Sequence, residues 1–251
     1  MGSFKMKIIA TIEARMTSSR LPGKVLLPAG NKPMLEHLVN RLKMVPSIGR
    51  IVLATTVNKA DEVLVEFGKK NGIEVFRGSE DDVMERVIRA AESVGGEILV
   101  EITGDCPIID PRIVEQTILT FLHNPCDYAS NVQVRSYPVG MDTQVYRLET
   151  LKKSFEMTHE ILDREHVTRH IRMHPEIFRQ INLVSSYDLH WPDLSLTLDE
   201  QADYELLKNI VEYFGPSKSD FSLHDVLHLL RSIHPEWIEL NRKVKRKGMH
   251  S

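Results

Sequence analysis

Short apolar segments rich in β-branched residues alternate with longer segments of helical periodicity over the first half of the chain. The strand-like segments are residues 7–12, 50–56, 73–78 and 97–103. The segments with apolar residues at the three- and four-residue spacing of an amphipathic helix are residues 33–45, 60–72 and 80–94. Strands that alternate with helices of this length predict β-α-β units, and hence an α/β fold with a mainly parallel sheet covered on both faces.

The pattern changes after about residue 125. Residues 127–151 combine short extended pieces with turn residues, and residues 149–175 show helical periodicity. Further strands are predicted at residues 178–186 and 194–200, and further amphipathic helices at residues 201–215 and 222–237. We expect a single domain over residues 1–251, with an inserted sub-region at about residues 130–175 and a tail at residues 235–251.

Composition argues against several classes of protein. The 251 residues are 42% hydrophobic and 27% charged, which is typical of a globular domain with a sizeable core. A net charge of −3 argues against a globally basic nucleic-acid binder. Cys106 and Cys126 form neither a C-x-x-C pair nor a disulfide framework, so we expect a cytoplasmic protein. No segment approaches the ~20 apolar residues of a membrane helix, and we expect neither a signal peptide nor a membrane partner.

Residues 14–24, with the sequence ARMTSSRLPGK, directly follow the first predicted strand. Arg15, Arg20 and Lys24 alternate there with hydroxyl residues, and such a set can bind and neutralise anionic oxygens. Ligands of parallel sheets bind beyond the carboxyl ends of the strands, where this loop is expected. The loop matches neither G-x-x-x-x-G-K-[ST] nor G-x-G-x-x-G. It is therefore another kind of phosphate-binding loop, or a solvated surface loop.

Two aspartates follow or end predicted strands. Asp105 and Asp199 could together hold one Mg²⁺, which prefers carboxylate, water and phosphate oxygens, although each could also be a simple turn residue. Glu101 is a weaker metal candidate, because strand alternation is expected to turn it away from Asp105. Asp110 and Ser222 are predicted to be helix N-caps, and Asn71-Gly72 is predicted to end the helix at residues 60–72.

Longer motifs carry a family resemblance. They are ARMTSSRLPGKVLLPAGNKPMLEHLVNRL, GSEDDVMERV, TGDCPIIDP, DYASN, RSYPVGMDTQV, REHVTRHI and LTLDEQADYELL. From Ile8 to about Phe214 the chain resembles the cytidylyltransferases that activate acidic sugars, the CMP-Kdo and CMP-sialic acid synthetases, and especially their SpsF-type branch. The resemblance implies a three-layer, Rossmann-like nucleotide-diphospho-sugar transferase fold. It also implies a Mg²⁺-dependent enzyme that joins CMP from CTP to a keto-acid sugar, releases pyrophosphate, serves surface polysaccharide biosynthesis and forms a homodimer.

The resemblance also implies roles for individual residues. Arg15, Lys24 and Asp105 would be catalytic, and Asp105 and Asp199 would bind the metal. The implied nucleotide-binding residues are Ala14, Arg15, Ser18, Arg20, Lys24, Arg77, Asp82, Arg86 and Asp105. The implied acceptor-binding residues are Arg135, Tyr137, Gly140, Asp142, Glu165, His166 and Thr168.

Several of these positions have a second interpretation. Gly140 could serve a hairpin turn, and Asp82 and Arg86 could be a routine i,i+4 helix pair. The SpsF-type branch usually has Gln in place of Glu13 and Gly in place of Thr17. These two departures would set a carboxylate beside the triphosphate and make the turn less permissive.

Three histidines, His166, His170 and His174, are four residues apart and would share one face of a continuous helix. Such a row without a nearby cysteine pair is weak support for zinc. Packing of the histidines within the protein and contact with the acceptor both remain open.

Two other transferase functions are alternatives. The chain could be a guanylyl- or uridylyltransferase that acts on a sugar 1-phosphate. It could also be a glycosyltransferase that uses a nucleotide sugar, but such enzymes normally carry an Asp-x-Asp motif, where this chain has Gly104-Asp105-Cys106. A non-enzymatic nucleotide-binding module is a third alternative, and it would bind nucleotide without metal dependence.

Overall fold

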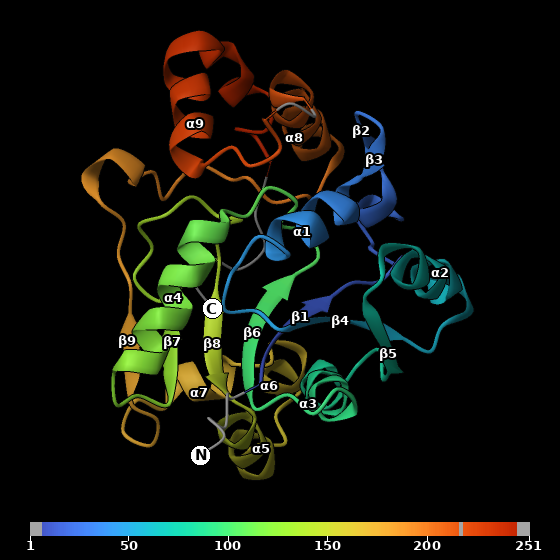
Figure 1. Ribbon diagram of the computed structural model, residues 1–251, viewed down its shortest axis with the longest axis vertical. Coiled ribbons are helices and arrows are strands. Elements are labelled where there is room, and N and C mark those ends of the chain that lie inside the picture. Colours follow the sequence, from blue (N-terminus) through green and yellow to red (C-terminus); the bar gives the residue numbers. More distant parts are fainter. Residues whose placement is uncertain (1–6, 216–217, 245–251) are drawn as a thin grey trace.

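A seven-stranded sheet forms the middle layer of the computed structural model, which describes residues 7–215 and 218–244 (Figure 1). In spatial order the strands are β5 (Glu74–Gly78), β4 (Arg50–Thr56), β1 (Ile8–Glu13), β6 (Ile98–Thr103), β8 (Gln144–Arg147), β7 (Tyr128–Ser130) and β9 (Gln180–Asn182). Strand β8 is antiparallel to both of its neighbours, and the other strand pairs are parallel. The sheet is therefore mainly parallel, as predicted. A small hairpin joins β2 (Pro28–Ala29) to β3 (Lys32–Pro33).

Helices cover both faces of this sheet and make the fold three-layered (Figure 1). One face carries α1 (Met34–Leu42), α2 (Glu62–Asn71) and α4 (Pro111–His123). The other carries α3 (Val83–Ser93), α5 (Leu148–Met157), α6 (Ile161–Glu165) and α7 (Arg169–Met173). A third apolar cluster is built around α8 (Gln201–Phe214) and α9 (Leu223–His228). Short helical turns lie at Lys24–Leu26, Lys59–Asp61, Tyr187–Leu189, Leu229–Ile233 and Pro235–Glu239.

Strand β1 illustrates how the sequence pattern builds the layers. Ala10 and Ile12 point to the cluster shared with α1, α2 and α4, whereas Ile9 points to the cluster shared with α3 and α5. Successive side chains of a strand face opposite sides, so a central strand covered on both faces needs a nearly continuous apolar run. The four strands and three helices predicted in the first half are confirmed, with ends that differ by at most three residues.

The predicted helix ends are confirmed as well. Asp110 accepts a hydrogen bond from the amide of Arg112, and Ser222 accepts one from the amide of Asp225, so both are N-caps. Gly72 ends α2 in the left-handed conformation with φ of 62°.

The long helix predicted at residues 149–175 is wrong in extent. The chain forms α5, α6 and α7 instead, with breaks around Thr158 and around Val167. Val167 has φ of 38°, a left-handed conformation that a β-branched residue rarely adopts and that no α-helix contains. Its side chain is buried against α3, so packing outweighs the helical pattern of the local sequence.

The strand predicted at residues 194–200 is also wrong. This segment makes a single bridge between Val139 and Ser195 and runs over the third cluster rather than in the sheet. Leu194, Leu196 and Leu198 are buried in that cluster, which explains the alternating pattern without a strand ladder.

Other expectations can be compared directly. Cys106 and Cys126 are both free, as predicted. Within the described part of the chain, no helix is long and apolar enough to span a membrane. Of the predicted tail, residues 245–251 lie outside the described residues.

Candidate active site

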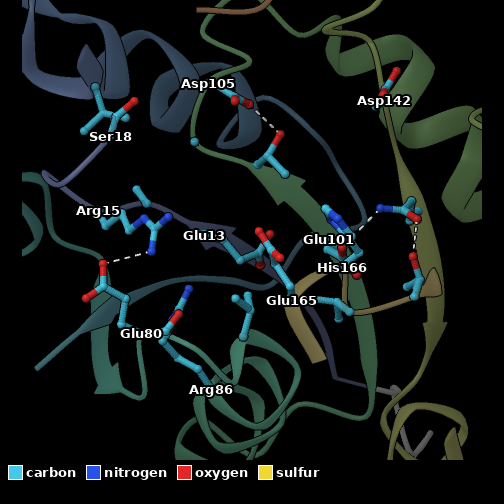
Figure 2. Close-up of a pocket in the computed structure, with 18 of the residues that line it drawn as sticks. Glu13, Arg15, Ser18, Glu80, Arg86, Glu101, Asp105, Asp142, Glu165 and His166 are labelled. Atoms are coloured by element: carbon cyan, nitrogen blue, oxygen red, sulfur yellow. Dashed lines mark hydrogen bonds and ion pairs between the residues drawn. The ribbon is translucent and has the colours of Figure 1, made fainter. Parts of the chain in front are cut away.

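A cavity of about 950 Å³ lies at the carboxyl ends of the central parallel strands (Figure 2). The loops after β1, β5 and β6 line one side of it, and β8 and the segment from α6 to α7 line the other. The parallel strands all end at this edge, so the loops that follow them meet there.

The loop after β1 is a closed turn fastened to the protein. The amide of Gly23 donates to the carbonyl oxygen of Met16 over 2.9 Å, and Gly23 has φ of 71°. The fully buried carboxylate of Asp61 accepts the amide of Met16 over 2.7 Å and also accepts the hydroxyl of Thr56. Asp61 thus ties the loop to the end of β4.

Lys24, at the end of this loop, lies between the two predicted metal ligands. Its Nζ is 3.2 Å from Oδ2 of Asp105 and 2.9 Å from Oδ1 of Asp199. Burial lowers the pKa of Lys24, but the two carboxylates more than offset this, so its pKa is raised. Arg20 also lies 2.9 Å from Oδ1 of Asp199.

This arrangement fits a divalent cation. Two carboxylates from distant parts of the chain converge on one cationic atom, and Thr103 donates to Asp105 over 2.6 Å. Oxygen donors of this kind suit Mg²⁺, which completes its shell with water and phosphate oxygens. The described residues include no group of three or more His, Cys, Asp or Glu side chains arranged around a metal position, so further ligands would come from solvent or substrate.

Close contacts between main-chain segments fix the positions of Asp105 and Asp199. A Cβ at Gly104 would lie 2.8 Å from the Cβ of Ala14 and 2.9 Å from the carbonyl oxygen of Glu13, so this turn requires glycine. The amide of Leu198 donates to the carbonyl oxygen of Asp105 over 2.8 Å. That one hydrogen bond brings Asp199 to the end of β6.

Arg15 projects into the other half of the cavity and is held by Glu80 (Figure 2). Its guanidinium lies 2.9 Å from Oε1 of Glu80, and the hydroxyl of Thr17 donates to the same oxygen over 2.9 Å. Asn58 donates to the second oxygen over 2.5 Å. Glu80 therefore pairs with Arg15, which was predicted to bind phosphate, and Thr17 helps to hold Glu80 in place.

The inner wall of the cavity is a hydrogen-bonded network. Glu101, which is 4% exposed, accepts a hydrogen bond from the hydroxyl of Tyr146 over 2.5 Å and one from the side-chain amide of Gln144 over 3.1 Å. Thr168 donates to Gln144 over 2.5 Å. Burial raises the pKa of Glu101 to about 7.

The expectation that Glu101 turns away from Asp105 is wrong. Residues 101, 103 and 105 all line this cavity, because a spacing of two keeps side chains on one face of a strand.

Glu13 lies at the centre of the cavity, and Arg86 lines the cavity on the side of α3 (Figure 2). Burial, and then the neighbouring Glu101, raise the pKa of Glu13 well above its ordinary value. Burial lowers the pKa of Arg86, although Glu13 opposes that shift. The departure from the resembling branch at position 13 thus puts a half-buried acid at the middle of the site.

The side of the cavity formed by β8, α6 and α7 carries the predicted acceptor residues. Arg135 and Asp142 form an ion pair there, and burial raises the pKa of Asp142 against the opposing effect of Arg135. Glu165 and His166 also line the cavity (Figure 2). This wall therefore presents both signs of charge.

The predicted site residues divide into two groups. Those that line the cavity are Ala14, Arg15, Ser18, Lys24, Arg86, Asp105, Arg135, Asp142, Glu165, His166 and Thr168. Those outside the lining are Arg20, Arg77, Asp82, Tyr137, Gly140 and Asp199. Of these, Arg20 and Asp199 form an ion pair with each other, and Asp199 also contacts Lys24, which lines the cavity.

Each of the other four outlying residues has a structural contact. Arg77 donates to the carbonyl oxygen of Thr56 over 2.9 Å, and Asp82 caps α3. Tyr137 is buried in the third apolar cluster. Gly140 has φ of 101°, and a Cβ there would lie 2.6 Å from a main-chain oxygen.

The break at Val167 separates His166 from the other two histidines of the row, whereas the rings of His170 and His174 lie together with centroids 4.5 Å apart. His166 lines the cavity, whereas His170 is buried and lies 3.1 Å from the hydroxyl of Ser154. His174 pairs with Glu176. Of the three, His166 is the one that lines this cavity, and packing accounts for His170.

Sequence reasoning missed Glu80, Gln144 and Arg172 as lining residues. Glu80 stands in the motif GSEDDVMERV, next to a candidate that was named, and could have been found there. Gln144 reaches the cavity because β8 pairs with β6, and no local pattern predicts that pairing.

Comparison with known proteins agrees with this geometry. A family model described as "Cytidylyltransferase" matches residues 9–226. The spore coat polysaccharide biosynthesis protein SpsF of Bacillus subtilis is 31% identical over 236 residues, which cover 89% of this chain and 93% of that protein. A 3-deoxy-manno-octulosonate cytidylyltransferase of Geobacter sulfurreducens is 31% identical over 120 residues, 48% of this chain and 47% of the relative.

A solved structure of a cytidylyltransferase from Leptospira borgpetersenii superimposes with a TM-score of 0.89 at 32% identity, and it covers 96% of this chain and 100% of that one. The matched region includes the cationic loop, both aspartates and the residues that line the cavity. The chain therefore belongs to the cytidylyltransferase family of nucleotidyltransferases.

Proposed function

We propose that this protein is a Mg²⁺-dependent cytidylyltransferase that joins CMP from CTP to a keto-acid sugar for surface polysaccharide biosynthesis. The observation that carries the proposal is the convergence of Asp105 and Asp199 on Lys24, directly beside the cationic loop after β1. The sugar and its use are supported by relatives named for spore coat polysaccharide and for 3-deoxy-manno-octulosonate.

In the proposed reaction an oxygen of the sugar attacks the α-phosphorus of CTP. The new P–O bond forms in line with the bond that breaks, and pyrophosphate leaves. Arg15, Arg20 and Lys24 bind the β- and γ-phosphates and offset their charge. The protein contributes mainly positioning and electrostatic stabilisation, because the substrates themselves supply the bonds that form and break.

Asp105 and Asp199 are the residues that would hold Mg²⁺. When bound, the ion supplies charge neutralisation and polarisation of the attacked phosphate. Lys24 lies between the two carboxylates in this structure. Its ammonium therefore offsets part of their negative charge before substrate binds. Arg15 holds Glu80 through one guanidinium nitrogen, and a guanidinium has further N–H donors that can bind phosphate.

The sugar occupies the side of the cavity formed by β8 and the segment from α6 to α7 in this proposal. Arg135 and His166 line this side and can offer donors to a carboxylate, while Asp142 and Glu165 can accept sugar hydroxyls.

Pyrophosphate release from CTP, UTP or GTP with Mg²⁺ and a panel of keto-acid sugars tests the function. We expect turnover with CTP and a strong loss of rate in Asp105→Asn and in Asp199→Asn, with thermal midpoints close to the wild type. Asp193→Asn is the matched control, because Asp193 is exposed and lies outside the cavity lining. Absence of both turnover and nucleotide binding would refute an enzymatic role, and preferred turnover of UTP or GTP would refute the choice of base.

A further inference from the structure

Glu13 presents an unpartnered carboxyl oxygen at the centre of the cavity. Its Oε1 is buried and has no hydrogen-bond partner among residues 7–215 and 218–244, while its side chain lines the cavity. Figure 2 shows it between Arg15, Arg86 and Glu101. A buried polar atom without a partner costs free energy, so one that faces a binding cavity points to a ligand.

Three of the side chains around Glu13 donate hydrogen bonds to other groups. Arg15 donates to Glu80, and NH1 of Arg86 donates to main-chain carbonyl groups just before α3. The hydroxyl of Tyr146 donates to the other buried carboxyl of the cavity. Nε of Arg86 is itself buried without a partner, so an unsatisfied donor accompanies the unsatisfied acceptor of Glu13.

We propose that the carboxyl of Glu13, in its neutral form, binds a substrate group that carries a hydrogen-bond acceptor and a donor side by side. A neutral carboxyl offers an O–H donor beside a carbonyl acceptor. A nucleobase edge and a pair of sugar hydroxyls both provide the complementary set. A phosphate does not, because it is negatively charged and lacks donors. The inference rests on the proposed function, since CTP and a sugar are the two sources of such a group.

The protonation state of Glu13 is consistent with this role. Burial and Glu101 on β6 raise its pKa, and Arg86 on α3 opposes them. Tyr146 on β8 also faces Glu13, and its hydroxyl is neutral at physiological pH because burial raises its pKa. Binding through Glu13 should therefore weaken as the pH rises and its carboxyl ionises.

Two variants separate hydrogen bonding from shape. Glu13→Gln keeps a donor and an acceptor side by side but cannot ionise, whereas Glu13→Leu keeps approximate size without either. Glu66→Gln is the control, because Glu66 is 66% exposed on α2. Calorimetry with CTP and with 3-deoxy-manno-octulosonate, each at about pH 6 and about pH 9, measures binding of both probes. Circular dichroism confirms that each variant is folded.

We expect Glu13→Leu to weaken one of the two probes about tenfold or more, and the probe affected identifies the source of the group. Glu13→Gln should bind within about threefold of the wild type and lose the decline at high pH. Wild-type affinity of Glu13→Leu for both probes would overturn the proposal, and so would a Glu13→Gln protein as defective as Glu13→Leu. CTP binding without pyrophosphate release would instead refute the proposed reaction. The affinities of the Glu13 variants could still be interpreted, because they do not depend on turnover.

Discussion

Ionisation of Glu101 should make the protein less stable as the pH rises. Its carboxyl ordinarily has a pKa of 4.5, and burial raises that pKa to about 7 in the folded protein. Between these two values the unfolded chain has lost the proton and the folded protein has kept it. The folded state therefore binds more protons, so the free energy of unfolding decreases with pH across this window. The stabilising contribution is complete below pH 4.5 and lost above about pH 7.

The magnitude follows from the shift. A difference of about 2.5 pKa units corresponds to about 3 kcal/mol. Glu101→Gln cannot ionise. Tyr146 and Gln144 now donate to the two different oxygens of Glu101, and glutamine replaces one of these oxygens with a nitrogen that cannot accept. Loss of one such bond costs about 1 kcal/mol. We expect the variant to be less stable than the wild type by about 1 kcal/mol in acid and more stable by about 2 kcal/mol above neutrality.

Urea unfolding followed by circular dichroism at about pH 4.5, 6, 7 and 8.5 measures this difference. The comparison between variant and wild type separates Glu101 from Asp142, whose pKa is raised as well, and it includes the effect of Glu101 on the pKa of Glu13. Glu66→Gln is the control and should track the wild type at every pH. A difference that does not change with pH, or one in which the wild type gains on the variant as the pH rises, would refute the reasoning.

Three further substitutions test individual contacts. Gly140→Ala should lower the free energy of unfolding by about 3 kcal/mol or more in urea titrations, because φ is 101° and the new Cβ would lie 2.6 Å from a carbonyl oxygen. Asp61→Ala should lower the free energy of unfolding by about 2–4 kcal/mol and raise the KM for CTP, because the amide of Met16 and the hydroxyl of Thr56 lose their acceptor. Unchanged kinetics would contradict the role of Asp61 in anchoring the loop. Glu80→Gln should lower the Kd for CTP in calorimetry by releasing Arg15, and weaker binding would instead indicate that Glu80 contacts the nucleotide.

The sequence predicted the sheet and the helices of the first half because their signals are local. Apolar run lengths and helix caps act within a few residues, so Asp110 and Gly72 could be assigned without the fold. The inner wall of the cavity depends instead on strand order. Gln144 meets Glu101 because β8 joins the sheet beside β6, and no local pattern contains that pairing. Homodimerisation through residues 130–175 stays a prediction.

Asp199 shows how an incorrect element can still lead to an informative residue. Residues 194–200 were expected to form a strand that ends at Asp199, yet they pack on the third cluster, and the amide of Leu198 donates to the carbonyl oxygen of Asp105 just after β6. Asp199 lies 2.9 Å from the Lys24 ammonium that Asp105 also contacts, and its amide donates to Asp203 of α8 over 3.2 Å. The position of the second carboxylate therefore depends on α8 and its apolar contacts rather than on a strand ladder. Substitutions that loosen this cluster should lower activity before they disturb the central sheet.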